Sequence, residues 1–234
     1  MIGRLRDGVE FARRARRPLP DAFWGGVYVA LSFTVLAGFV VLGHQLAVLA
    51  AAARGDIGAP SFERTTDRVR SGANAALVTL AYGVPPLAAL GVVATRVVSF
   101  PSGLVPTVSV TPVDAAVAVV AAPLPVLLVP PALLAYHESG RLGAAFAPSA
   151  FRPLASGRYL GVALGVAVVA VAVVPLLALG TAFTYGSLIV LVPFILFSLF
   201  TVLNYALGTA YGEAVGDLDP AERGSFGFED EPEF

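Results

Sequence analysis

The sequence lacks both cysteine and lysine, and it is poor in charged residues of either sign. Without cysteine, disulfide bonds, thiol catalysis and cysteine-ligated metal sites are excluded. Charged residues make up 13% of the chain and hydrophobic residues 57%, whereas a soluble domain carries roughly twice this charged fraction. All basic residues are arginine and the C-terminal tail is acidic. That combination is typical of a GC-rich coding sequence and of a halophile.

Long stretches of the chain carry no charge at all. Between Arg158 and Glu213 there are 54 consecutive uncharged residues, which is enough for two membrane crossings of about 20 residues each. Five apolar segments follow one another, at residues 22–53, 72–98, 113–136, 158–180 and 185–211. We therefore predict an all-α, polytopic membrane helix bundle.

Charge divides the chain into three regions: a basic amphipathic segment at 1–21, a membrane domain at 22–211 and an acidic, disordered tail at 212–234. In the first region Ile2, Leu5, Val9 and Ala12 share one helix face, a pattern that suits a helix on the membrane surface. We interpret this region as retained, because the apolar run that follows is too long for the core of a signal peptide.

The first apolar segment, 22–53, allows two topologies. It is either one long tilted helix or a re-entrant hairpin that turns near Ala37 and Gly38, and a hairpin is tolerated where protein buries it. Five simple crossings divide the arginines almost evenly between the two sides, whereas a hairpin followed by four full spans leaves Arg96 alone on one side. Since cytoplasmic flanks are enriched in arginine, the hairpin is favoured, with the C-terminus in the cytoplasm.

One connector is written twice. The stretch "RGDIGAPSF" begins at Arg54 and "SGRLGAAF" begins at Ser139. Three positions of the first match three of the second: Gly55, Gly58 and Ala59 correspond to Gly140, Gly143 and Ala144. This predicts a parallel internal repeat of helix, connector and helix, an arrangement found in some transporters. The alternative is that any short cytoplasmic loop needs glycine turns and flanking arginines.

Polar residues inside apolar segments are the natural candidates for a functional site. His44 and Gln45 form either a proton relay or ligand group, or a neutral pair bonded to a neighbouring helix. His137 and Glu138 resemble half of a metal site, but zinc normally takes three or four ligands. In both cases the structural alternative is favoured.

Further residues are predicted to hold helices together. Asn74 and Asn204 are expected to form interhelical hydrogen bonds. Arg96 and Asp114 flank the uncharged outer link and are expected to form an ion pair. A stripe of small residues for close helix packing is predicted at Gly157, Gly161 and Gly165.

Four stretches carry a resemblance to a known family: "LSFTVLAGFVVLGHQL", "GAPSFERTTDRVRSGANAALVTLAYGVPP", "PPALLAYHESGRLGAAF" and "NYALGTAYGEAV". Over most of residues 22–215 the chain resembles an uncharacterised family of haloarchaeal multi-pass membrane proteins, known as a domain of unknown function (DUF4013). The resemblance implies a membrane location and brings no activity with it.

No pattern predicts an enzyme. The two histidines lie far apart in the sequence and no nucleophile–base or metal-ligand motif is present, so no catalytic, cofactor or metal residues are predicted. The predicted function is that of an integral membrane protein that binds lipids, or a protein partner at the cytoplasmic face, or organises an assembly. The alternative is a small transporter or channel component with a parallel repeat. Nucleic acid is not an expected partner, and the oligomeric state is left open.

Overall fold

The computed structural model describes residues 2–15, 18–31, 35–61, 65–99, 107–183 and 191–216, and within them the chain is almost wholly helical. The helices are α1 (Ile2–Arg13), α2 (Pro18–Ala30), α3 (Val35–Ala53), α4 (Thr65–Val97), α5 (Pro112–Ala121), α6 (Leu124–Ser139), α7 (Gly157–Phe183) and α8 (Val192–Val215). Two 3₁₀ helices, η1 (Leu142–Phe146) and η2 (Pro148–Ala155), join α6 to α7. A pair of two-residue strands, β1 (Val98–Ser99) and β2 (Thr107–Val108), runs antiparallel beyond α4.

Four helical stretches are long and apolar enough to cross a membrane: Val35–Ala53, Thr66–Val97, Pro112–Ser139 and Val192–Val215. A fifth is obtained if η2 and the first part of α7, which meet at a bend of 91°, count as one broken span. The predicted all-α bundle with five apolar segments is confirmed. At about 1.5 Å per residue, α4 is about 50 Å long, well above the 30 Å of a bilayer core. The helix is therefore longer than one crossing requires, and its first turns carry Arg68 and Arg70.

The segment at 22–53 is divided into two helices. Neither a single long helix nor a turn at Ala37 and Gly38 is found, because α2 ends at Ala30 and both of those residues lie within α3. One glycine costs a helix only about 1 kcal/mol, and Ala37 is buried in the bundle, so packing keeps this part helical. The thirteen residues of α2 extend only about 20 Å, which is too short to cross a bilayer.

Glycines set the closest helix contacts. A Cβ added to Gly43 of α3 would overlap the Arg68 carbonyl of α4, and one added to Gly72 of α4 would overlap the Phe39 carbonyl of α3. Gly208 brings α8 equally close to the Leu49 carbonyl of α3. Small residues allow helix backbones to approach closely, so α3 packs directly against both α4 and α8.

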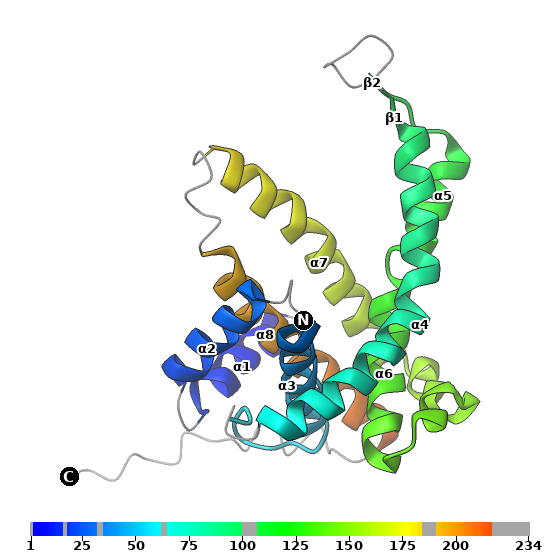
Figure 1. The fold of residues 1–234 in the computed structure, drawn as a ribbon. Coiled ribbons are helices and arrows are strands. Elements are labelled where there is room, and N and C mark those ends of the chain that lie inside the picture. Colours follow the sequence, from blue (N-terminus) through cyan, green and yellow to red (C-terminus); the bar gives the residue numbers. More distant parts are fainter. Residues whose placement is uncertain are drawn as a thin grey trace, which may run out of the picture.

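The glycine stripe predicted on α7 does not have this role within the chain. A Cβ added to Gly157 or to Gly161 would meet no atom within 4 Å. Figure 1 shows that α7 packs on the bundle at its lower end, where it begins, and leans away from the α4–α5 pair further along. Its buried side chains, Tyr159, Val162, Ala163 and Val166, lie on the opposite helix face, against Leu203 and Leu207 of α8. The apolar stripe of α7 therefore decides its packing, and Gly157 and Gly161 face outward.

Both repeated connectors lie at the same end of the bundle, shown at the bottom of Figure 1. Gly55 follows the end of α3 with φ 78°, and Gly140 follows the end of α6 with φ 67°. A left-handed residue after a helix is nearly always glycine because a Cβ is strained there, so the match has a physical cause at this position. It does not extend to the next glycine: Gly58 contacts the Arg14 backbone, whereas Gly143 has no atom within 4 Å of an added Cβ.

The N-terminal helix α1 packs on the bundle. Its buried residues are Gly8 and Phe11, and Phe11 lies with Val48 and Ala51 of α3. The predicted stripe differs, because Ile2 and Val9 are exposed. The other terminal boundary also moves: α8 continues to Val215, so residues 212–215 belong to the bundle. Residues 217–234, where the acidic tail was predicted, are outside the described part.

Candidate functional site

Polar side chains join α3 to α8 inside the bundle. The Asn204 amide nitrogen donates to Gln45 Oε1 at 2.9 Å, and Gln45 Nε2 donates to Thr201 Oγ1 at 3.4 Å. Thr201 Oγ1 in turn donates to the Phe197 carbonyl at 3.0 Å. Gln45 and Thr201 are buried. In an apolar surrounding each such bond contributes about 0.6 to 2 kcal/mol, and the predicted interhelical role of Asn204 is confirmed.

Asn74 has the same role at another contact. Its amide nitrogen donates to the Tyr136 hydroxyl at 2.8 Å and so joins α4 to α6. Tyr82, two turns further along α4, donates to the Ala145 carbonyl in η1 at 3.0 Å. The first bond holds α6 against α4, and the second holds the second connector, residues 140–156, against α4.

His44 lies beside this polar network. Its ring is 2% exposed and stacks on Phe197 of α8, with ring centres 5.4 Å apart. It also lines a cavity of about 60 Å³ together with Asp21 of α2, Ser198 and Thr201 of α8. The cavity has room for a few water molecules. It brings a carboxylate, an imidazole and two hydroxyls together from three helices.

His137 and Glu138 lie at the surface. Both are exposed at the end of α6, beside the first turns of the second connector. Among the described residues, no group of three histidine or acidic side chains is placed to hold a metal ion.

Asp114 does not pair with Arg96. It belongs to a capping box at the start of α5: Thr111 Oγ1 donates to Asp114 Oδ2 at 2.6 Å, and the Asp114 amide donates back to Thr111 Oγ1 at 3.2 Å. Arg96 lies near enough for its charge to act on Asp114, as predicted, but no ion pair joins the two in the part of the chain that the structure describes. Asp114 forms the cap instead of an ion pair for a physical reason. A cap satisfies the free amide groups at the start of a helix, and it does so without fixing a long arginine side chain.

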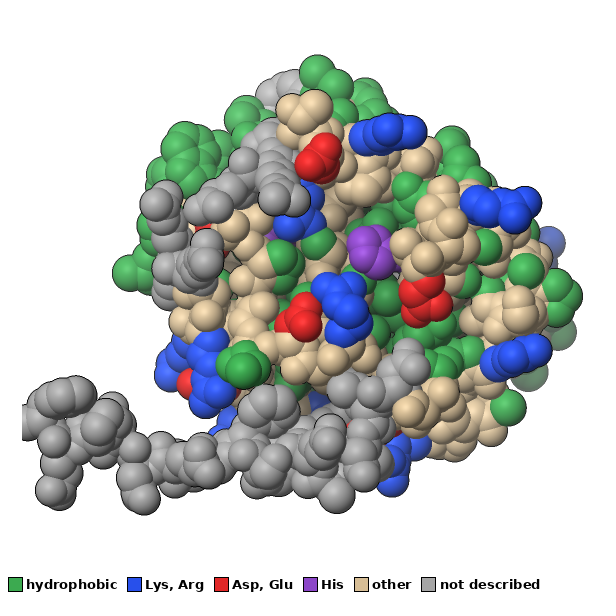
Figure 2. Space-filling model, turned by 90° about the horizontal axis from the view of Figure 1, so that it is seen from below, with side chains coloured by type: hydrophobic (Ala, Val, Ile, Leu, Met, Phe, Trp, Pro, Cys, Tyr) green, Lys and Arg blue, Asp and Glu red, His purple; other side chains and the backbone are tan. Residues whose placement is uncertain are grey.

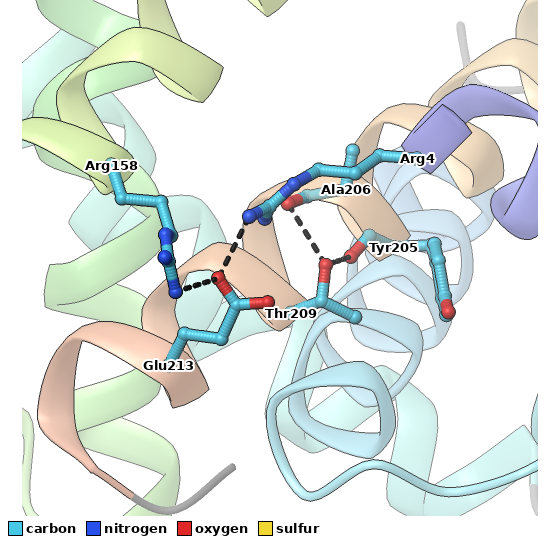
Figure 3. Close-up of polar contacts among 6 residues, drawn as sticks. All are labelled: Arg4, Arg158, Tyr205, Ala206, Thr209 and Glu213. Carbon is cyan, nitrogen blue, oxygen red and sulfur yellow. Dashed lines mark hydrogen bonds and ion pairs between the residues drawn. The ribbon is translucent and has the colours of Figure 1, made fainter. Parts of the chain in front are cut away.

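A charged cluster connects α1, α7 and α8 (Figure 3). Arg4 Nη2 lies 2.7 Å from Glu213 Oε2, and Arg158 Nη1 lies 3.5 Å from the same oxygen. The Glu213 side chain is only 2% exposed, Arg4 is 15% exposed and Arg158 is 54% exposed. Glu213 stands at the end of the long uncharged stretch, which is why the sequence assigned it to the tail.

Arginines without acidic partners gather at the end of the bundle that carries both connectors (Figure 2). Arg70, Arg141 and Arg152 are exposed there, and none of the three forms an ion pair within the described ranges. Arg54 of the first connector is paired with Asp56 at 2.9 Å. Arg96 is found near the opposite end, close to the strand pair. We call Arg70, Arg141 and Arg152 the arginine face.

Two members of these sites were missed by sequence reasoning. Asp21 lies near the N-terminal arginines in the sequence, and this position suggests a charge on the protein surface. Only the packing of α2 on α8 brings it close to His44. Glu213 could have been found, because helical spacing from Thr209 places it on the same side of an unbroken apolar helix.

Comparison with known proteins gives one match. A family described as "Protein of unknown function (DUF4013)" matches residues 27–184. No curated protein and no solved structure matches.

Proposed function

The chain belongs to this family, DUF4013, and we propose that it is an integral membrane protein that acts by binding at its arginine face rather than by catalysis. The proposed ligands are membrane lipids and a cytoplasmic protein partner. The proposed location is the cell membrane of a halophilic archaeon, which is supported by the exclusive use of arginine and the acidic tail.

The observation that carries this proposal is the uneven placement of arginine in three dimensions. Both connectors and the end of α8 lie at one end of the bundle, and the exposed arginines of the arginine face are there. Arg96 lies toward the other end. Because cytoplasmic flanks of spans are enriched in arginine and lysine, the arginine face is the proposed cytoplasmic surface. Its arginines have no acidic partner among the described residues, so they are available to phosphate or carboxylate groups.

The use made of buried polar groups supports a binding role. Gln45, Asn74 and Asn204 are engaged in bonds between helices, and these bonds account for them without a reaction. In the proposed topology α2 enters partway from the cytoplasmic side and returns through α3, in keeping with its short length. Its exposed Phe23 and Trp24 suit the interfacial region of a bilayer.

Co-purification from native membranes tests this proposal. The variant carries Arg70→Gln, Arg141→Gln and Arg152→Gln, and the control carries Arg96→Gln, which removes an exposed arginine near the opposite end. We expect the wild type and the control to retain the same protein partner and the same anionic lipids, and the triple variant to lose most of the protein partner together with the lipids that the arginine face holds. If the triple variant retains the wild-type set, the arginine face is not the binding surface.

One observation favours the alternative, a small transporter. The cavity between α2, α3 and α8 brings Asp21 and His44 together, and ionisable groups inside a membrane domain commonly mark a pathway. Reconstituted into proteoliposomes, a transporter would move added small cations or protons, and His44→Phe would abolish that movement. Equal leak with wild type, variant and empty liposomes would reject this alternative.

A further inference from the structure

The cluster of Arg4, Arg158 and Glu213 contains more positive than negative charge. Both guanidinium groups converge on one carboxylate oxygen, Oε2 of Glu213, and Figure 3 shows them reaching it from opposite sides. Among the described residues, the two positive groups and one negative group of this cluster leave one uncompensated charge. The Arg4 side chain is 15% exposed, and a poorly solvated charge without a counter-ion is costly.

The donors of Arg4 show the same imbalance. One of its terminal nitrogens, Nη2, donates to Glu213. The other, Nη1, is buried and has no hydrogen-bond partner in the part of the chain that the structure describes. A buried donor without an acceptor costs about 1 to 3 kcal/mol, so the described chain does not satisfy the Arg4 guanidinium, and an anion at its exposed edge would offset the charge.

Arg158 makes the cluster accessible. Its side chain is 54% exposed, and its contact with Glu213 is the longer of the two, at 3.5 Å. It starts at the second residue of α7, at the end of the bundle that carries the arginine face. Most of the N–H donors of its guanidinium group are therefore accessible. In the proposed topology they lie where the spanning helices leave the apolar layer.

These observations define the class of ligand. Guanidinium groups bind phosphate through two parallel N–H···O bonds, and two arginines on one anion suit a phosphate, whose several oxygens can accept from both. Basic pockets between spanning helices on the cytoplasmic side bind the headgroups of anionic lipids. We propose that Arg4 and Arg158, held by Glu213, bind the phosphate of an anionic lipid headgroup. This rests on the proposed function, of which it names one ligand and its site.

Two substitutions test the site without removing the cluster. Arg4→Lys keeps a positive charge beside Glu213 but removes the fork that a phosphate needs. Arg158→Gln removes the exposed arm and leaves the short Arg4–Glu213 pair in place. Arg13→Gln is the control, because Arg13 is an exposed arginine of the same helix α1 that lies outside the cluster. Thermal unfolding of each purified, full-length protein establishes that it is folded.

The measurement is lipid binding by native mass spectrometry in detergent. Phosphatidylglycerol and phosphatidylcholine are titrated separately, and inorganic phosphate is added in a third arm. We expect the wild type and Arg13→Gln to prefer phosphatidylglycerol, and Arg4→Lys and Arg158→Gln each to weaken that binding about tenfold or more, the loss of one two-bond contact. Inorganic phosphate should compete with the lipid in the wild type.

The outcomes distinguish a lipid phosphate from free phosphate as the ligand. They also distinguish a failure of this site from a failure of the proposed function. Binding of inorganic phosphate that depends on both arginines, without a preference between the lipids, would overturn the lipid as ligand. Equal binding of phosphatidylglycerol by folded wild type and both cluster variants would overturn the site itself. The proposed function has its own test, since Arg70→Gln, Arg141→Gln and Arg152→Gln leave this cluster intact.

Discussion

Glu213 joins three helices through one buried carboxylate. Its side chain is 2% exposed and is held by Arg4 and Arg158. A buried ion pair adds little stability compared with apolar residues, but the removal of one partner leaves an uncompensated charge and costs several kcal/mol. The fixed position of α1 on α8 therefore depends strongly on this residue.

We predict that Glu213→Ala lowers the free energy of unfolding by about 3 kcal/mol and releases α1 from α8. Glu10→Ala is the matched control, because Glu10 pairs with Arg14 at 3.1 Å but its side chain is 52% exposed, and such surface pairs contribute about 0.5 kcal/mol or less. Denaturant titration gives both values, and limited proteolysis after Arg13 reports on α1. Equal losses in the two variants would contradict the structural role of Glu213.

Single residues were predictable where one local rule decides. An amide inside an apolar helix must find a partner, so the bonds of Asn74 and Asn204 followed from the sequence, although Tyr136 and Gln45 as their partners did not. Asp114 was assigned to the wrong interaction because a cap and an ion pair are both available to an acid beside a helix start. The pairing of Asp21 with the His44 cavity depends on how α2 lies on α8, which no local rule gives.

The helices are held together by glycine contacts at some crossings and by side-chain packing at others. Gly72 lets α4 lie directly on the Phe39 backbone of α3, whereas Gly161 of α7 faces outward with no neighbour within 4 Å. Both glycines lie within helices of similar, largely apolar composition. The chain therefore contains a close-packed glycine and an open one that can be compared directly.

We predict opposite results for the same change at these two sites. Gly72→Ala forces the α3 and α4 backbones apart and should destabilise the protein by about 1 to 3 kcal/mol. Gly161→Ala should be neutral or stabilise by up to about 1 kcal/mol, because alanine is the better helix former and has room. Thermal unfolding in detergent measures both. Destabilisation at Gly161 as large as at Gly72 would show that a second molecule or lipid packs closely there.

At the level of elements, the apolar segments predicted the helices, and their ends were less certain. Length and hydropathy predicted the four to five helical stretches that are long and apolar enough to cross a membrane, since a bilayer demands about 20 apolar residues from each span. The break within 22–53 was misplaced because Ala37 and Gly38 look permissive for a turn but are packed inside α3. The two connectors do contain glycine turns, at Gly55 and Gly140. The glycine stripe predicted on α7 was wrong about close packing at Gly157 and Gly161, because the pattern of glycines does not say which face meets a neighbour.

The whole molecule is a bundle with chemically different ends. One end carries both connectors and the arginine face, and the link beyond β1 at the other end follows Arg96. The sequence indicated this asymmetry through the arginine count. The folded arrangement strengthens this asymmetry, because the two connectors lie at the same end of the bundle. In the sequence they are far apart, since Gly55 and Gly140 are separated by 85 residues.

The central claim is that this arginine-rich end faces the cytoplasm, and single-cysteine labelling tests it directly because the native chain has no cysteine. Three exposed positions report on the two ends: Ile57 in the first connector, Ser149 in the second, and Ser109 beyond β2. In intact cells a membrane-impermeant maleimide should label Ser109→Cys, and it should label Ile57→Cys and Ser149→Cys only after permeabilisation. Labelling of Ile57→Cys or Ser149→Cys in intact cells, with protection of Ser109→Cys, would contradict the orientation.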